Sequence, residues 1–379
     1  MASSFPVAPP PKSLLGRYRL LAPTAGIRVS PLCLGAMNFG DNWSSFMGPC
    51  DEATTDQILD VFYNQVCNFI DTANGYQFGD SERRIGTWMT KRGVRDQMVI
   101  ATKYSTNLVL GTNGPPIQAN YGGNATKSMV LSVNESLKRL QTDYIDLLYV
   151  HWWDYSTSIQ EIMQSLNTLV QQGKVLYLGI SDAPAWVVSK ANEYARNHGL
   201  RPFSVYQGRW SAATRDFERD IIPMCRDEGM GLCPWGALGG GKFKTEEQQR
   251  AQEARTGELT EADVAVSAVL ERIARRENAV LSSIALAYVL HKAPYVFPIV
   301  GVRDMVHIQG CIDALSIELT EEDVQEIEAA IPFDLGFPHS MLWGQSVPKA
   351  PQQMWFTSLS GEFDNVEPPK AIKPASKKD

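Results

Sequence analysis

The sequence lacks the features that mark several large classes of protein. Its longest apolar stretch, Val280–Val302, is interrupted by His291, Lys292 and two prolines, so no transmembrane helix is predicted. It has no excess of positive charge, since the formal net charge is -7, and nothing global therefore indicates binding to nucleic acid or to an anionic membrane. Its six cysteines form no C-x-x-C pair, which argues against a disulfide or zinc framework and favours reduced, buried thiols.

Two further absences concern targeting and metals. The stretch from Met1 to Pro6 has neither a basic region nor an apolar core, so we expect no signal peptide and a cytoplasmic location. Among the five histidines, only His151 stands at a clear strand end. A metal-dependent barrel hydrolase needs several His, Asp or Glu ligands clustered at strand ends, so we expect no metal site.

The sequence does contain a regular alternation of strand-like and helix-like segments over most of its 379 residues. Short apolar runs alternate with longer segments whose apolar residues recur at helical spacing, which is typical of a parallel α/β fold. Eight strands are expected, at Leu32–Gly35, Asn68–Thr72, Met98–Lys103, Ile145–His151, Val175–Ser181, Ser204–Gln207, Met230–Cys233 and Tyr295–Val300. The sequence therefore predicts an α/β fold of the (β/α)8 type, a TIM barrel.

Additional segments are expected at both ends of the barrel. Tyr18–Leu21 and Ile27–Ser30 flank a Pro/Gly turn and predict an N-terminal β-hairpin. Thr320 to about Ala330 predicts an extra C-terminal helix, and the chain after Ile331 is expected to fold over the barrel mouth. The expected organisation is a flexible N-terminal lead, one barrel domain and a partly disordered tail, at residues 1–16, 17–345 and 346–379.

Titratable side chains follow three successive predicted strands. Asp71, Lys103 and His151 end the second, third and fourth strands, and Tyr76 comes five positions after Asp71. Because the carboxyl ends of the strands meet at one end of such a barrel, we expect these four side chains to form one site. Each alone has a more ordinary explanation, as a helix cap, a solvated strand end, a rim aromatic or a core histidine. Their shared position weakens that explanation.

The four residue types suit protonation of a carbonyl oxygen. Tyrosine can donate the proton, although its unperturbed pKa of about 10 makes it a weak acid at neutral pH. A neighbouring ammonium group lowers that pKa, so Lys103 is expected to activate Tyr76, with Asp71 as the counter-charge of the lysine. His151 is placed to orient the carbonyl. No side chain supplies a hydride, so a reduction would need a nicotinamide cofactor.

The same residues carry a resemblance to a known family. The segments Asp71–Tyr76 with Ser81-Glu82, Thr102-Lys103 and Asp146–His151 resemble the aldo-keto reductase superfamily. More particular likenesses, to its fungal branch of aryl-alcohol dehydrogenases and norsolorinic acid reductase-like enzymes, lie in His151–Asp154, Leu34–Gly40 and Ile331–Pro338. The resemblance covers about residues 17–345. It implies NADPH-dependent carbonyl reduction in which Tyr76 donates the proton, Lys103 and Asp71 tune it, and His151 orients the substrate.

The cofactor site is expected along the later strands of the barrel. No G-x-G-x-x-G follows the first strand, which argues against a Rossmann fold, and Phe243 stands where a P-loop needs Ser or Thr. The glycines of the loop-like stretch 236–259 can let backbone amides approach a pyrophosphate. The resemblance implies NADP(H) contacts from Asp71, Ser181, Asp182, Gln207, Trp235, Gly236, Ala237, Leu238, Gly240, Gly241, Lys242, Arg303 and His307. Arg303 is the candidate for the 2′-phosphate, whereas Gly310 and Cys311 depart from the family's residues near the adenine.

Tryptophans in the loops after the strands indicate the substrate class. Trp43, Trp152 and Trp210 are expected to line the substrate site together with His151. Apolar pockets suit aromatic ligands, so an aromatic aldehyde, ketone or alcohol is favoured, with roughly half of the large loop aromatics only packing against one another. The alternative function is a regulatory subunit that binds a nicotinamide cofactor with little turnover. The sequence makes no prediction of the oligomeric state.

Overall fold

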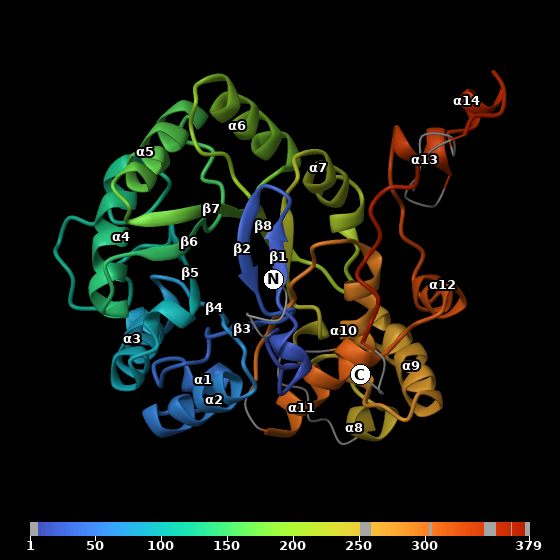
Figure 1. Ribbon diagram of the computed structural model, residues 1–379, viewed down its shortest axis with the longest axis horizontal. Coiled ribbons are helices and arrows are strands. Elements are labelled where there is room, and N and C mark those ends of the chain that lie inside the picture. Colours follow the sequence, from blue (N-terminus) through green and yellow to red (C-terminus); the bar gives the residue numbers. More distant parts are fainter. Residues whose placement is uncertain (1–6, 251–258, 303–304, 345–353, 365, 376–379) are drawn as a thin grey trace.

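Eight parallel strands form the centre of the computed structural model, which describes residues 7–250, 259–302, 305–344, 354–364 and 366–375 (Figure 1). The strands are β3 (Cys33–Gly35), β4 (Phe69–Asp71), β5 (Val99–Tyr104), β6 (Ile145–Val150), β7 (Val175–Ser181), β8 (Val205–Arg209), β9 (Gly231–Trp235) and β10 (Ile299–Val300). They are hydrogen-bonded in the order β10-β3-β4-β5-β6-β7-β8-β9. A parallel bridge between Leu232 and Val296 brings β9 to the chain before β10, so the sheet curls into a barrel. The predicted (β/α)8 barrel is confirmed.

Helices surround these strands, in the positions that the alternating sequence predicts (Figure 1). They are α1 (Ser44–Met47), α2 (Glu52–Asn64), α3 (Asp80–Arg92), α4 (Thr126–Leu140), α5 (Ile159–Gln171), α6 (Ala185–Asn197), α7 (Ile221–Asp227), α8 (Glu246–Arg250), α9 (Glu261–Arg276), α10 (Leu281–Lys292), α11 (Met305–Asp313), α12 (Glu321–Ala329), α13 (His339–Trp343) and α14 (Trp355–Ser358). Local sequence sets their starts: the side chains of Ser158 and Thr320 accept a backbone N–H in the first turns of α5 and α12. The extra C-terminal helix is thus confirmed as α12.

The interior of the barrel has its own apolar core, which the N-terminal hairpin closes. β1 (Arg19–Ala22) and β2 (Ala25–Val29) pair antiparallel, as the sequence predicts. Leu21 and Val29 pack with Phe69 and Phe297 inside the barrel. The contact needs a glycine at the start of β9, because a Cβ on Gly231 would lie 2.2 Å from the Leu21 carbonyl oxygen. The hairpin therefore seals the N-terminal end of the barrel and leaves the C-terminal end for chemistry.

Two segments differ from the sequence-based expectation. The stretch 236–259, expected to be a loop, contains a 3-10 turn η5 (Gly239–Gly241) and the short helix α8 within its described part. The helix expected from Asp216 to Glu228 is divided into a 3-10 turn η4 (Asp216–Glu218) and α7. Pro223 explains the division, since it has no N–H for a continuous helix but is tolerated in the first turn of a new one.

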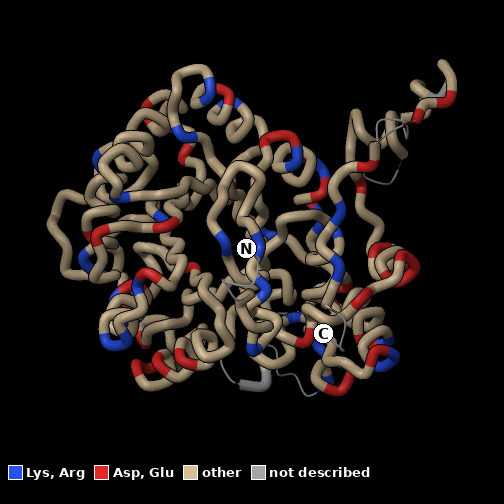
Figure 2. The backbone as a smooth tube through the Cα atoms, in the orientation of Figure 1, with Lys and Arg blue, Asp and Glu red and all other residues tan. Residues whose placement is uncertain are grey.

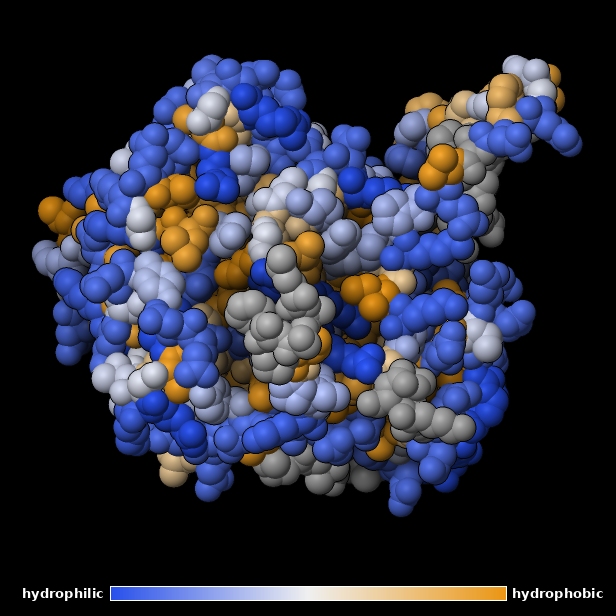
Figure 3. Space-filling view, viewed as in Figure 1, coloured by the Kyte–Doolittle hydropathy of each residue, from blue (hydrophilic) through white to orange (hydrophobic). Residues whose placement is uncertain are grey.

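The chain after α12 runs beside the β8–α7 connection. The Phe333 ring lies under two guanidinium groups, 5.3 Å from Arg215 and 5.1 Å from Arg219. Arg219 also donates to the carbonyl oxygens of Leu335 and Asp334. Beyond this contact α13 and α14 stand away from the barrel as an arm with apolar side chains on its surface (Figures 1 and 3). The backbone N–H of Ala375 then donates to the Leu315 carbonyl, so the chain returns to the barrel.

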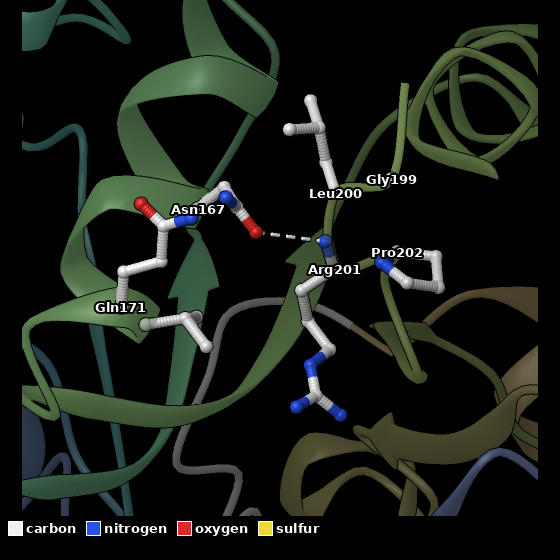
Figure 4. Close-up of a pocket in the computed structure, with 7 residues that line it drawn as sticks. Asn167, Gln171, Gly199, Leu200, Arg201 and Pro202 are labelled. Carbon is white, nitrogen blue, oxygen red and sulfur yellow. Dashed lines mark hydrogen bonds between the residues drawn. The ribbon is translucent and has the colours of Figure 1, made fainter. Parts of the chain in front are cut away.

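Charged residues of both signs are distributed over the outer helices (Figure 2). No helix in the described parts of the chain is long and apolar enough to cross a lipid bilayer. All six cysteines are buried and unpaired, as expected. A shallow hollow lies between α5 and the segment before β8, where the Asn167 side-chain oxygen accepts the Arg201 backbone N–H (Figure 4). This hollow is at the N-terminal edge of the strands, away from the predicted site.

Candidate active site

Asp71, Lys103 and Tyr76 meet at the C-terminal end of the barrel. Lys103 on β5 is fully buried, and its ammonium nitrogen lies 2.5 Å from Asp71 Oδ1, 2.8 Å from the Thr72 carbonyl oxygen and 3.3 Å from Tyr76 Oη. An ammonium group has three N–H donors, and each has a partner here. The lysine is therefore held in one orientation, with one donor aimed at the tyrosine hydroxyl.

The electrostatics of this cluster differ in one respect from the sequence-based expectation. Burial lowers the pKa of Lys103, but the adjacent Asp71 carboxylate outweighs this and the pKa is raised, so the lysine stays charged. Burial also raises the pKa of Tyr76, and the neighbouring Lys103 offsets this only in part because Asp71 acts in the opposite sense. The expected net lowering of the Tyr76 pKa is thus wrong for the protein alone. At neutral pH the hydroxyl carries its proton.

His151 stands beside this cluster just after β6. Its ring centroid lies 5.8 Å from that of Tyr76, nearly edge to face, and its Nδ1 is 3.4 Å from Thr106 Oγ1. Burial, helped by the charge of Lys103, lowers the pKa of His151 to about 3. The imidazole is neutral over the physiological range and can offer a hydrogen bond beside the tyrosine hydroxyl without adding charge.

The predicted nicotinamide residues lie along the ends of β7, β8 and β9. Gln207 Nε2 donates to Asp71 Oδ2 at 2.9 Å, so both oxygens of that carboxylate are bonded. Asp182 accepts from Ser181 Oγ at 2.8 Å and from Trp235 Nε1 at 3.3 Å. Trp235 remains 38% exposed, which leaves ring surface for stacking against a planar ligand. Amide, carboxylate and aromatic groups together fit a nicotinamide ring with its carboxamide.

A glycine-rich turn follows Trp235. Gly236, Gly239, Gly240 and Gly241 all have positive φ, between 62° and 86°, a conformation that residues with side chains rarely adopt. Such a turn can present backbone N–H groups to phosphate, and no Cβ stands in the way. Within it Ala237 is buried and Leu238 is partly buried. The turn therefore fits the diphosphate of a dinucleotide.

The structure gives less support to a cofactor contact for three other predicted residues, Lys242, His307 and Arg303. Lys242 Nζ lies 3.2 Å from Asp263 Oδ2, so its ammonium already has a carboxylate partner within the protein. His307 is exposed on α11. Arg303, the candidate for the 2′-phosphate, lies outside the described residues.

An aromatic wall stands over Tyr76. The ring centroid of Trp43 lies 6.3 Å from that of Tyr76, 5.9 Å from Phe78 and 5.7 Å from Phe46. Trp152 is exposed on the loop after β6. Trp210 is different: it is fully buried, stacks on Phe217 and donates to Glu218, so it presents no surface to a substrate here and that expectation is not met.

Sequence reasoning missed Gln77, the residue that fixes this wall. Gln77 is fully buried, with a left-handed φ of 52°. Its Nε2 donates to the Met37 carbonyl at 3.2 Å, and its Oε1 accepts the Trp43 backbone N–H at 2.8 Å. The side chain thus ties the loop that carries Trp43 to the residue next to Tyr76. Its position directly after the tyrosine was the only signal in the sequence.

A buried ionic network holds the loop between β4 and Tyr76. Arg139 on α4 donates to the Asn74 carbonyl at 2.8 Å and lies 3.3 Å from Glu82. Glu82 accepts from Thr102 Oγ1 at 2.7 Å. The network thereby connects the loop that carries Tyr76 with the strand that carries Lys103.

Comparison with known proteins agrees with this geometry. Norsolorinic acid reductase B of Dothistroma septosporum is 57% identical over 370 residues, 94% of each chain. Aryl-alcohol dehydrogenase GME11368 of Pestalotiopsis microspora is 54% identical over 368 residues, 96% of this chain and 95% of the other. Aryl-alcohol dehydrogenase [NADP(+)] of Phanerodontia chrysosporium is 46% identical over 387 residues, 97% and 98% of the two chains.

The match at family level covers most of the barrel. Residues 31–332, from two residues before β3 to just after α12, fit the Aldo/keto reductase family. This span contains Asp71, Tyr76, Lys103 and His151 and also the glycine-rich turn. With eight parallel strands, a terminal hairpin and polar groups at the strand ends, the chain belongs to the aldo/keto reductase family and is an oxidoreductase of carbonyl and alcohol groups.

Proposed function

We propose that the protein is an NADPH-dependent reductase that interconverts aromatic aldehydes or ketones and their alcohols, with Tyr76 as the general acid and base. The observation that carries the proposal is the Tyr76 hydroxyl at 3.3 Å from a buried ammonium group that has no other free donor. The relative named for NADP(+) supports the choice of cofactor, and the relatives named as norsolorinic acid reductases support an aromatic substrate and a role in secondary metabolism.

Reduction of a carbonyl needs a hydride at carbon and a proton at oxygen. NADPH, when bound, supplies the hydride. Tyr76 supplies the proton from Oη, and Lys103 stabilises the phenolate that remains. Neutral His151 is placed to hydrogen-bond the same oxygen and hold the carbonyl in line. Asp71 keeps Lys103 charged and oriented. Because the pKa of Tyr76 is raised, its hydroxyl keeps the proton until negative charge develops on the substrate oxygen.

The groups that would hold the cofactor have separate tasks. Ser181, Asp182 and Gln207 would hold the carboxamide, Trp235 would stack on the nicotinamide, and the glycine turn would accept the diphosphate. The aromatic wall around Trp43 would orient a flat substrate and exclude water from the tyrosine.

We place the enzyme in the cytoplasm on the strength of its reduced cysteines.

The test measures NADPH oxidation by the purified protein with a panel of aromatic aldehydes and polycyclic aromatic ketones, for wild type and Tyr76→Phe. The variant should lose about 10²- to 10⁴-fold in kcat, the usual contribution of general acid catalysis, and should still bind NADP+. Tyr194→Phe, on the outer helix α6, is the matched control and should turn over normally. Undiminished turnover in Tyr76→Phe would refute the mechanism. Tight NADP+ binding by wild type without turnover of any carbonyl would favour the regulatory alternative.

A further inference from the structure

Arg209 places a cation beside the proposed nicotinamide site. It is the last residue of β8 and pairs in register with Trp235, the last residue of β9. Its guanidinium carbon lies 6.0 Å from the centre of the Trp235 ring, and the side chain is exposed. A Cβ built on Gly236 would lie 3.8 Å from Arg209 Cγ, so the stem of the arginine runs beside the first residue of the glycine-rich turn.

The charge of Arg209 is not neutralised within the described part of the protein. No carboxylate there forms an ion pair with it, and its contact with Trp235 uses the ring face and not a negative group. Asp182, on the other side of Trp235, is bonded to that indole and to Ser181. Lys242, one of the cofactor contacts that the resemblance implies, is 3.2 Å from Asp263. In an acidic protein of net charge -7, Arg209 is thus a cation available at this strand end.

The neighbourhood of this arginine fits an anion. A guanidinium has a planar fork of N–H donors that matches phosphate oxygens. The adjoining turn has four glycines with positive φ, which let backbone N–H groups approach the same ligand. A nicotinamide on Trp235 would carry its diphosphate only a ribose away, within reach of a side chain that starts next to Gly236.

We propose that Arg209 binds the diphosphate of the nicotinamide dinucleotide. The inference rests on the proposed function, because it requires a dinucleotide at Trp235. It places at the diphosphate a cation other than Lys242, whose ammonium pairs with Asp263, and it holds equally for NADP+ and NAD+, since both have the same diphosphate.

The test measures dissociation constants of three ligands, NADP+, NAD+ and ADP-ribose, for wild type and Arg209→Met by calorimetry. ADP-ribose has the diphosphate without the nicotinamide. Loss of one charge-assisted contact should weaken all three ligands by a similar factor, about ten- to a hundredfold. Arg209→Lys should lose less than Arg209→Met, and the salt dependence of binding should become shallower in Arg209→Met. Arg201→Met, an exposed arginine at the opposite rim, is the control and should bind like wild type.

Each other outcome overturns the assignment in a recognisable way. A loss confined to NADP+ would place Arg209 at the 2′-phosphate. Normal binding of ADP-ribose with weakened NAD+ and NADP+ would mean that Arg209 acts on the nicotinamide ring. Unchanged affinities for all three ligands would leave it a solvent-exposed residue. If wild type binds none of these ligands, the proposed function itself fails, which is distinct from a failure of Arg209 alone.

Discussion

The two halves of the site are built in opposite ways. In the proton-transfer half, Lys103 is fully buried, its three donors are used, and both oxygens of Asp71 accept hydrogen bonds. In the cofactor half, Trp235 is 38% exposed, Arg209 is exposed, and a turn of glycines follows. The proton-transfer half is closed, because its hydrogen-bond donors and acceptors are paired within the protein. The cofactor half is open, because its exposed groups are arranged to contact a ligand. Substitutions in the first half should therefore cost stability, and those in the second should cost affinity.

Asp71→Ala gives the largest expected effect. It leaves the Lys103 ammonium buried without a counter-charge, which should lower the free energy of unfolding by about 3–5 kcal/mol. Arg209→Met, in the open half, should change it by less than about 0.5 kcal/mol. Urea unfolding followed by circular dichroism measures both, and Asp71→Ala/Lys103→Met should recover part of the loss because the unpaired charge is removed. Equal effects in the two halves would contradict the comparison.

Acid should weaken the closed half through His151. Its pKa is about 3 in the folded protein and about 6.5 in the unfolded chain, so between these values the unfolded chain binds more protons. Stability is therefore present above about pH 6.5 and is lost as the pH falls towards 3. At about pH 4.5, two pH units below the unfolded value, this loss should be about 2.7 kcal/mol, and His151→Gln should be spared it. Urea unfolding at about pH 4.5 and at a pH above about 6.5 tests this. The control is His198→Gln on the exposed end of α6, which should behave as wild type.

Gln77→Met tests the connection between the closed half and the substrate wall. Methionine has a similar length but loses both side-chain hydrogen bonds to the loop of Trp43, which should cost about 1–2 kcal/mol of stability. The KM for a bulky aromatic ketone should rise about tenfold if the misplaced wall costs the bound substrate a similar free energy. The rise should be smaller for a small aldehyde. NADP+ affinity should be unchanged. The control is Gln164→Met on α5, and equal KM changes for large and small substrates would argue against a role in positioning the wall.

Tyr149→Phe should have the smallest effect. The hydroxyl of Tyr149 is buried inside the barrel, where no nitrogen or oxygen in the described part of the protein bonds to it and the buried Cys233 thiol is a weak hydrogen-bonding neighbour, while its ring packs on Gly179. Its removal should leave the free energy of unfolding unchanged or raise it by up to about 1 kcal/mol. Tyr206→Phe is the matched control, since that hydroxyl bonds to both the N–H and the carbonyl of Ala183 and its loss should cost about 1–2 kcal/mol. A larger loss of unfolding free energy in Tyr149→Phe than in Tyr206→Phe would show that the Tyr149 hydroxyl makes a strong hydrogen bond.

The sequence predicted those features that strand periodicity and strand order determine. Asp71, Lys103 and His151 could be placed together because each ends a strand, and parallel strands in a barrel end on one rim. Trp210 could not be distinguished from Trp43 in this way, because only the three-dimensional packing shows that it stacks on Phe217. The pairing of Lys242 with Asp263 joins residues on separate elements, so no local pattern contains it.

The pKa of Tyr76 shows a second kind of limit. Charge neighbours can be inferred from sequence, and Lys103 does act in the expected direction on this group. Burial cannot be inferred in the same way, and here it outweighs the lysine. The left-handed conformation of Gln77, a residue that rarely adopts it, was equally invisible to a pattern of residue types.

The hairpin that seals the N-terminal end of the barrel also constrains the order of events at the other end. With Leu21 and Val29 filling that end, cofactor and substrate must enter and leave through the same opening. Under the proposed function, the nicotinamide and the carbonyl compound would therefore share one entrance. We expect the cofactor to bind before the substrate and the alcohol product to leave before the spent cofactor.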